Sequence, residues 1–173
     1  MKTYEDLVDP EVFRDAMRLT ASGVTVVTTD GEEGRAGLTV STLCSLSMDP
    51  PSVVVCIHRD NRALSTLLAN GVFMANVLAY EQSRVADAFA GVIPELRENR
   101  YAAGAWKTLH TGAPALEGAM CNFDCRVAQV FEFGSHLILA GEVLALESAP
   151  ASPLVFSDRS YRRLNPAARM GTN

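Results

Sequence analysis

The strongest constraint on the fold is a hairpin pattern that runs from residue 119 to residue 146. Odd positions of 119–131 are mostly apolar, and the even positions nearby include Asn122, Asp124, Arg126 and Glu132. Because successive side chains of a strand point to opposite faces, this alternation predicts a strand with one face in water. "FGSH" at 133–136 predicts the turn, and "LILAGEVLAL" at 137–146 predicts the return strand. The return strand is apolar on both faces, so we expect a helix or another subunit to cover its outside.

The rest of the chain is predicted to consist mainly of short strands. They are expected at 24–29, 38–47, 52–57 and 72–78, with a closing hairpin at 153–164. Apolar residues at helical spacing predict helices at 8–20, capped by Asp9, and at 61–71 and 81–91, whereas 91–105 is expected to be irregular and mobile. Roughly seven strands without regular strand–helix alternation favour a mainly β fold. The expected architecture is a partly open antiparallel Greek-key barrel with short flanking helices, not a doubly wound sheet. We see no repeat or linker, and expect one domain over 1–173 with a core of about 13–164.

Charge and hydropathy exclude several classes of partner. The 173-residue chain carries a net charge of -5, which argues against a nucleic-acid or anionic-membrane partner, since both require clustered Lys and Arg. No apolar run reaches the ~20 residues that span a bilayer. The charged N-terminus lacks the apolar segment of a secretory signal, so we expect a cytoplasmic protein.

The cysteines and the common catalytic motifs exclude further chemistry. Cys121 and Cys125 in "CNFDC" could be half of a zinc site, but the three histidines are scattered along the chain. We therefore expect no metal, and reduced, buried cysteines. The chain has no G-x-G-x-x-G, no P-loop and no G-x-S-x-G motif. A Rossmann cofactor site and a nucleophile-elbow hydrolase are accordingly not supported.

Short hydroxyl side chains accumulate in "AGLTVSTLCSLSMDPP" at 36–51. Together with backbone N–H groups they offer neutral donors for a phosphate or for the polar edge of a heterocycle. "HRDNR" at 58–62 directly precedes a predicted helix, and Arg62 beside a helix N-terminus suits a phosphate. Gly37 allows a close backbone approach. These residues predict two loops that hold a flat phosphorylated ligand, unless the hydroxyls only suit an exposed strand and Asn61 only caps a helix.

Three other residues leave two interpretations open. His136, in the predicted turn, could bind a ligand or simply be solvated. Tyr161 could be a stacking lid or an edge-strand aromatic, and Trp106 is as compatible with the core as with a ligand contact.

From about Phe13 to Leu164 the chain resembles the short-chain flavin reductases of two-component flavin-dependent monooxygenases, which have the FMN-binding split barrel. The resemblance rests on segments that occur in the same order: "FRDAMRLTASGVTVVTT", "GLTVSTLCSLSMDPPSVVVCI", "FMANVL", "EQSRVADAFAG", "CNFDC", "FGSHLILAGEVLAL" and "PLVFSDRSYRRL". It implies an NAD(P)H:flavin oxidoreductase that uses NADH or NADPH to reduce FMN or FAD. No local basic cluster stands out to read the 2′-phosphate of NADPH, so the nicotinamide stays open. The resemblance also implies that free reduced flavin passes to a partner monooxygenase.

The same resemblance implies a homodimer with flavin at the subunit boundary, and it assigns site residues. The flavin ring and phosphate arm are expected along Gly37, Leu38, Thr39, Val40, Ser41 and Thr42. The other side of the flavin and its phosphate are expected at Cys56, Ile57, His58, Asn61, Arg62 and Ala63, with Asn76 and Ser83 nearby. His136 and Tyr161 would line the nicotinamide pocket, with His136 positioning the nicotinamide. The family usually has Gly-Asp-His where this chain has Gly134, Ser135 and His136, which leaves the orientation of His136 open.

Two alternatives are kept. One is a reductase of the same fold that retains flavin and reduces another acceptor, ferric iron or cobalamin. The other is a flavin-binding protein without turnover, because a fold alone does not fix a function.

Overall fold

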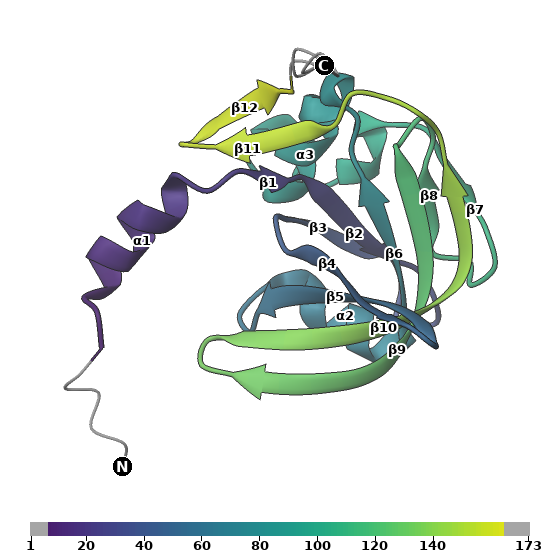
Figure 1. Ribbon diagram of the computed structural model, residues 1–173. Helices are drawn as coiled ribbons and strands as arrows, with labels where there is room; N and C mark the ends of the chain where they lie inside the picture. Colours follow the sequence, from purple (N-terminus) through teal and green to yellow (C-terminus); the bar gives the residue numbers. More distant parts are fainter. Residues whose placement is uncertain (1–6, 165–173) are drawn as a thin grey trace, which may run out of the picture.

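The computed structural model describes residues 7–164, and its centre is a seven-stranded antiparallel sheet (Figure 1). The strand order is β3-β2-β6-β9-β10-β5-β4. The bounds are β2 Thr25–Thr29, β3 Ala36–Val40, β4 Leu43–Met48, β5 Pro51–His58, β6 Val72–Val77, β9 Cys121–Phe133 and β10 His136–Ser148. The two edge strands, β3 and β4, are joined by Ser41 and Thr42 alone. The sheet must therefore curl until its edges approach each other, and this produces a split barrel.

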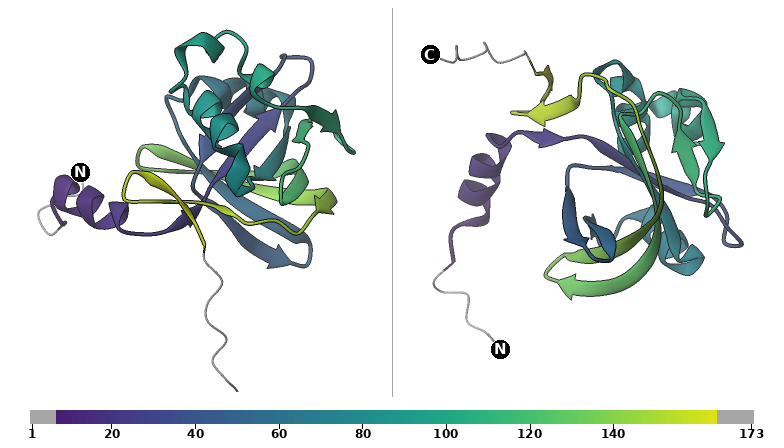
Figure 2. Two further views of the ribbon diagram at one scale, coloured as in Figure 1. Left: turned by 90° about the horizontal axis from the view of Figure 1, so that it is seen from above. Right: turned by 45° about the vertical axis from the view of Figure 1, so that its right-hand side comes forward.

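The α-helices of the described chain are α1 Pro10–Arg18, α2 Arg62–Asn70 and α3 Ser83–Ala90. The predicted cap of α1 is confirmed, since Oδ1 of Asp9 accepts hydrogen bonds from the backbone N–H of Glu11 and Val12. Helices α2 and α3 pack against β2 and β3. Helix α1 projects away from the barrel and buries none of its residues (Figures 1 and 2). No helix within 7–164 is long and apolar enough to cross a membrane.

Two large apolar clusters, one on each face of the sheet, form most of the core, and a small third cluster contains Met74, Ala113 and Ala115. Val27 belongs to the cluster beneath α2, together with Phe73 and Leu139. Its neighbour Val26 belongs to the cluster beneath α3, together with Phe89. Adjacent residues of β2 thus point to opposite faces and both are fully buried, which explains why this strand is apolar or β-branched throughout.

Shorter elements close the two ends of the fold. β1 Ser22–Gly23, β11 Leu154–Ser157 and β12 Ser160–Arg163 form a small sheet, and β7 Trp106–Thr108 pairs with β8 Pro114–Leu116. Three 3₁₀ helices, η1 Tyr80–Gln82, η2 Pro94–Leu96 and η3 Arg100–Ala103, lie among the described connections.

The segment 91–105 is more ordered than its sequence suggests. It contains η2 and η3, and the rings of Tyr101 and Trp106 pack against Phe89 with centroids 5.0 and 5.5 Å apart. Trp106 also donates a hydrogen bond from Nε1 to the carbonyl of Tyr101 at 2.8 Å. The expectation of an irregular segment was wrong because aromatic side chains at its end anchor it to α3.

The predicted strand 38–47 is also corrected, because the chain leaves one edge of the sheet at Val40 and joins the other at Leu43. The apolar and hydroxyl pattern continues across this break, so periodicity does not reveal it. Ser41 and Thr42 form this crossing, and their short hydroxyl side chains can hydrogen-bond nearby backbone groups.

The prediction that one face of β9 lies in water is wrong at two positions. Asn122 and Asp124 are buried, with 4% and 0% of their surface exposed. Asp124 accepts hydrogen bonds from the backbone N–H groups of His110 and Thr111 and from the Thr111 hydroxyl. The segment before β8 thus covers this face of β9 and pairs its polar groups, a condition that buried polar groups must meet.

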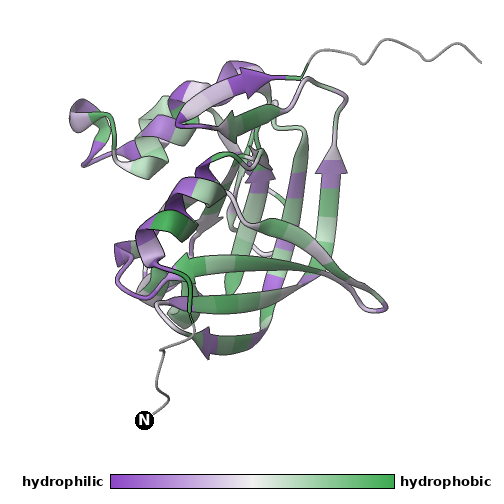
Figure 3. Ribbon diagram, turned by 60° about the vertical axis from the view of Figure 1, so that its left-hand side comes forward, coloured by the Kyte–Doolittle hydropathy of each residue, from purple (hydrophilic) through white to green (hydrophobic). Residues whose placement is uncertain are grey.

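The expectation that both faces of the return strand are covered holds for its first half. Leu137, Leu139 and Ala140 are buried, whereas Leu144 and Leu146 are 41% and 55% exposed. Figure 3 shows hydrophobic stretches in the strands of the barrel, interrupted by hydrophilic positions. This chain therefore leaves the far half of β10 without cover.

Candidate functional site

The seam between β3 and β4 presents the hydroxyls that the sequence singles out. Thr42 ties the crossing between these strands to β5, because its Oγ1 accepts a hydrogen bond from the N–H of Cys56 and donates one to the carbonyl of Cys56, both at 3.1 Å. Ser41 is exposed, and no hydrogen bond of its hydroxyl occurs in the described chain. The two adjacent hydroxyls therefore differ in role: Thr42 holds the seam, and Ser41 is available to a ligand.

A cavity of about 470 Å³ lies beside this seam. Three parts of the fold line this cavity. They are β3 with Ser41, α3 with the residues after it, and the C-terminal hairpin of β11 and β12. The lining residues are Thr39, Val40, Ser41, Asp87, Ala90, Val92, Phe156, Arg159 and Tyr161. Val24 also lines it. This volume lies in the range of small-molecule sites.

Most polar groups of this cavity are already oriented by the protein. Thr39 donates its hydroxyl proton to the carbonyl of Ala86 at 2.7 Å, and the Tyr161 hydroxyl donates to Oδ1 of Asp87 at 2.7 Å. Burial, and then this bond to Asp87, raise the pKa of Tyr161. The one hydroxyl proton of Tyr161 is consequently used by Asp87, and its neutral oxygen can only accept a hydrogen bond from a ligand. Ser83 lies one helical turn before Asp87 and shares its helix face.

The other predicted loop lies between β5 and α2. Oδ1 of Asn61 accepts a hydrogen bond from the N–H of Ala63 at 3.0 Å and caps α2. Arg62, the first residue of α2, is exposed and makes no ion pair in the described chain. A helix N-terminus with a free guanidinium is favourable for an anion.

His136 is held next to this loop by strand pairing. It pairs with His58 in the β10–β5 register, and the two imidazole rings meet edge to face with centroids 5.1 Å apart. The Oγ of Ser135 lies 2.9 Å from Nδ1 of His136. Arg59 ties the turn down, since its N–H donates to the carbonyl of Ser135 at 3.0 Å. Ser135 thus provides a partner for the imidazole where the family usually has an Asp.

Several residues that were expected to face the flavin or the nicotinamide have different surroundings in the structure. The side chains of Leu38 and Ile57 are in the core, so only their backbone can face a ligand. A Cβ on Gly37 would lie 2.5 Å from the Phe89 ring, so the close neighbour of this glycine is α3. His136 lines neither described cavity and no contact joins it to Tyr161, so this chain does not bring the two expected nicotinamide contacts together.

The assignment of Asn76 to the flavin needs correction. Asn76 has none of its surface exposed, and its Nδ2 donates to the carbonyl of Val26 at 2.9 Å. Its Oδ1 accepts from the N–H of Leu116 at 2.7 Å and from Asn122 at 2.8 Å. Its amide is fully used in joining β2, β6, β8 and β9, which gives it a structural role.

The structure also reveals residues that the sequence analysis missed. Asp87 orients Tyr161, and Arg97 and Arg100 line a second cavity of about 560 Å³ together with Arg35 and Arg62. These arginines form a basic cluster only in the folded chain. Their separation along the sequence hid the group, because no local basic run marks it.

Comparisons with known proteins agree with the barrel fold. The family profile described as "Flavin reductase like domain" matches residues 17–165. The chain belongs to the flavin reductase-like family.

Individual relatives support this membership. A protein of Methylorubrum extorquens named FMN reductase (NADH) RutF 1 is 43% identical over 166 residues, covering 95% of this chain and 82% of that protein. The solved structure of the NADH:FAD oxidoreductase SgcE6 of Streptomyces globisporus is similar with a TM-score of 0.83 at 32% identity, covering 93% of this chain and 98% of that one. The styrene monooxygenase flavin reductase SMOB of Pseudomonas putida gives a TM-score of 0.77 at 29% identity, covering 90% of this chain and 98% of that one.

Proposed function

We propose that this chain is an NADH-dependent flavin reductase that reduces FMN and releases the reduced flavin to a separate monooxygenase. The observation that carries the proposal is the pair of rims at Ser41–Thr42 and at His58–Ala63 in a member of the flavin reductase-like family. Thr42 holds the first rim to β5, the strand that leads into the second, through its hydrogen bonds to Cys56. The similarity to proteins named as FMN reductase (NADH) and as flavin reductases of monooxygenases supports the substrates and the partner.

The residues present fit a flavin that binds and leaves. Ser41 and the backbone N–H groups of the rim are uncharged donors, which suit the polar edge of a flavin ring, while Arg62 and the N-terminus of α2 suit one phosphate. Hydride chemistry is supplied by the nicotinamide and the flavin. The protein has to hold the two rings at roughly 3–3.5 Å and to stabilise charge that forms on the reduced flavin. We assign positioning of the nicotinamide to His136.

A homodimer completes the proposal. Exposed apolar side chains lie on α1 (Phe13 and Met17), at the turn end of the β9–β10 hairpin (Phe131 and Phe133) and at the opposite end of that hairpin (Leu144 and Leu146). Figures 1 and 2 show α1 standing clear of the barrel, as expected for an element that packs on a second copy. Apolar surface of this extent on one molecule marks an interface, and a second copy would bring its own hairpin to the site. The acidic composition and four free cysteines favour a cytoplasmic location.

A steady-state assay that crosses NADH and NADPH with riboflavin, FMN and FAD tests this function through the loss of nicotinamide absorbance. We expect the highest kcat/KM with NADH and FMN, and no turnover without flavin. Gel filtration then separates the alternatives. Flavin that elutes free of the protein supports a diffusible product, whereas flavin that co-elutes favours the reductase with a bound cofactor and another acceptor. Absence of turnover with every combination would leave a flavin-binding protein.

A further inference from the structure

The turn between β11 and β12 holds two residues other than glycine in the left-handed region of backbone conformation. Ser157 pairs with Ser160, so Asp158 and Arg159 form a two-residue loop. Their φ angles are 48° and 58°, and no other non-glycine residue of 7–164 has a positive φ. A type I′ turn requires this conformation at both central positions, and glycine is preferred at the second because a Cβ is strained there. Arg159 therefore occupies a position at which the backbone alone favours glycine.

Contacts on both sides of Arg159 hold this turn in place. The N–H of Asp158 donates to the carbonyl of Arg18, the last residue of α1, at 2.7 Å, and the Arg18 guanidinium lies 3.5 Å from Oδ1 of Asp158. Two residues after Arg159, the Tyr161 hydroxyl is bonded to Asp87 of α3. A strained conformation persists only where its surroundings impose it. The fold therefore imposes the position of Arg159.

Arg159 lines the cavity of about 470 Å³ beside Ser41, and it is the one basic residue of that lining. It is exposed and forms no ion pair within residues 7–164. Asp87, the one carboxylate of the lining, is bonded to Tyr161 instead. Backbone strain is retained at positions where the side chain has a function. A strained arginine in a cavity wall, without a counter-charge in the described chain, indicates that it binds an anion from outside the chain.

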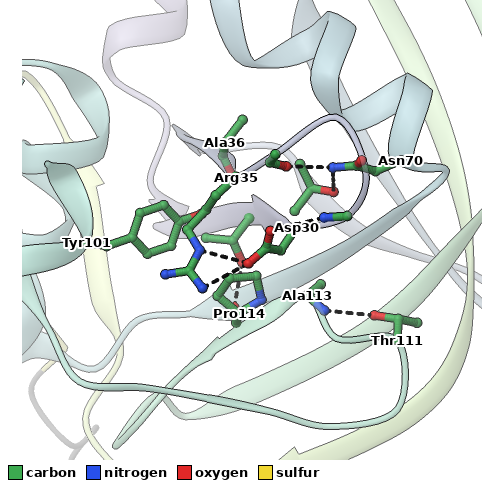
Figure 4. Close-up of polar contacts among 12 residues, drawn as sticks. Asp30, Arg35, Ala36, Asn70, Tyr101, Thr111, Ala113 and Pro114 are labelled. Atoms are coloured by element: carbon green, nitrogen blue, oxygen red, sulfur yellow. Dashed lines mark hydrogen bonds and ion pairs between the residues drawn. The ribbon is translucent and has the colours of Figure 1, made fainter. Parts of the chain in front are cut away.

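The comparison with Arg35 shows what differs when the fold itself uses a guanidinium. The Nε of Arg35 donates to Oδ2 of Asp30 at 2.9 Å, and its guanidinium lies over the Tyr101 ring, 4.8 Å from the centroid (Figure 4). Arg35 thus joins two segments of the chain. Arg159 has no comparable charged or aromatic partner within the described residues, so the gain that offsets its strain has to come from a ligand.

Of the two reactants, NADH is the one whose anionic group has no assigned partner. The flavin phosphate is assigned to Arg62 and the N-terminus of α2, and Arg62 does not line the cavity beside Ser41. We propose that Arg159 is a specificity-determining residue that binds the phosphates of NADH while the nicotinamide lies on the flavin ring. The inference rests on the proposed function. A guanidinium suits this role because its paired N–H donors match phosphate oxygens and it stays charged at every working pH.

Replacement of Arg159 by glycine separates ligand binding from stability without any turnover. Arg159→Gly supplies the residue that the turn prefers, so we expect its urea midpoint to equal or exceed that of wild type. We expect the Kd of NAD⁺, measured by isothermal titration calorimetry on protein saturated with FMN, to rise at least tenfold in this variant. Arg84→Gln removes the same charge at an exposed position of α3 that lines neither cavity, and its Kd for NAD⁺ should equal that of wild type.

Two reductants then identify the group that Arg159 binds. N-benzyl dihydronicotinamide has the reacting ring of NADH without its phosphates. With FMN as acceptor, Arg159→Gly should lower kcat/KM for NADH at least tenfold and leave kcat/KM for the benzyl compound within twofold of wild type. Equal losses with both reductants would place Arg159 on a ring, and a raised KM for FMN with an unchanged KM for riboflavin would place it on the flavin phosphate; either result would overturn the assignment.

Three further results would also overturn the role of Arg159. They are failure of wild type to bind NAD⁺, an unchanged Kd for NAD⁺ in Arg159→Gly, and a lower urea midpoint of this variant, because the fold itself would then use the arginine side chain. Reduction of FMN by wild type with either reductant reports on the proposed function separately.

Discussion

The hydroxyl of Tyr161 donates a hydrogen bond to Oδ1 of Asp87 at 2.7 Å and thereby ties the C-terminal hairpin to α3. Both residues line the cavity next to Ser41. The pKa of the phenol is raised above its ordinary value of 10.0, first by burial and then by this bond. The link therefore persists at neutral pH and fixes one wall of the proposed flavin site.

A dependence of stability on alkaline pH follows from this link. A phenol with a higher pKa in the folded state contributes stability that is complete below the ordinary pKa of 10.0 and is lost as the pH rises past it. Burial raises the pKa of Tyr101 in the same direction. We expect the free energy of unfolding, measured by urea denaturation at a series of pH values, to fall above pH 10.0. In the Tyr101→Phe/Tyr161→Phe variant this fall should be less steep.

The remaining slope in that variant has an identifiable source. Burial raises the pKa of the Cys125 thiol from 9.0 to about 12, so unfolding releases this proton as well. Equal slopes in wild type and the double variant would contradict the contribution of the two phenols.

Gly37 is predicted to be intolerant of any side chain. A Cβ at this position would lie 2.5 Å from Cε1 of Phe89 and 3.0 Å from the carbonyl oxygen of Val27. Overpacking of this kind costs about 1–3 kcal/mol, so Gly37→Ala should lower the free energy of unfolding by that amount. Gly23→Ala is the matched control, because nothing lies within 4 Å of its Cβ. Denaturation curves that show equal stability for the two variants would mean that α3 can shift without cost.

Substitutions of the two hydroxyl residues at the seam, Ser41 and Thr42, should separate an effect on FMN binding from an effect on stability. Ser41→Ala removes an exposed hydroxyl without a partner in the described chain, so FMN affinity should fall severalfold while stability stays within about 0.5 kcal/mol. Thr42→Val removes both hydrogen bonds to Cys56 and should lower stability by about 1–2 kcal/mol. Fluorescence titration with FMN and urea denaturation measure the two quantities. A Ser41→Ala protein with wild-type FMN affinity would argue against the flavin site.

His136 is predicted to affect the nicotinamide more than the flavin. His136→Ala should raise the KM for NADH by more than the KM for FMN, because we assign this imidazole to positioning the nicotinamide. Ser135→Ala removes the oxygen that lies 2.9 Å from Nδ1, so it should have a smaller effect in the same direction. His58→Ala, at the neighbouring ring, is the control and should act mainly on the KM for FMN. Equal changes of both KM values in His136→Ala would reject the positioning role.

Local rules predicted much of the fold. The cap at Asp9, the stop of α2 at Gly71 and the β9–β10 hairpin depend on neighbouring residues, and all are present. The break at Ser41–Thr42 was missed because it depends on closure of the barrel, which involves strands far apart in the sequence. The burial of Asn122 and Asp124 was missed for the same reason, since their partners come from segments beyond the strand itself.

Residues of the candidate site could be selected from the sequence only where a local sequence pattern marks them. The hydroxyl run and the capped start of α2 are local patterns, so Ser41, Thr42 and Arg62 could be selected from sequence. Asn76 fits a family segment, but its amide joins four strands, and no local pattern around it reveals such partners. The arginine-lined cavity combines residues 35, 62, 97 and 100, which only the folded chain brings together.

A dimer in solution is the last prediction, and it depends on the exposed apolar side chains of α1 and the β9–β10 hairpin. Phe131 and Phe133, at the turn end of the hairpin, are 52% and 80% exposed, and Leu146, which pairs with Phe123 at the opposite end, is 55% exposed. Sedimentation equilibrium of wild type should give twice the chain mass of 18.6 kDa.

Phe131→Glu places a charge in that apolar surface and should shift the protein to monomer, because an unpaired charge is costly in a dry interface. Ala69→Glu is the control, since this exposed position on α2 lies outside the patch, and its protein should remain dimeric. If the hairpin of one copy completes the flavin site of the other, monomeric Phe131→Glu should also lose FMN affinity while it keeps its secondary structure by circular dichroism. A wild-type monomer at micromolar concentration would refute the dimer, and a monomeric variant with full FMN affinity would confine the site to one chain.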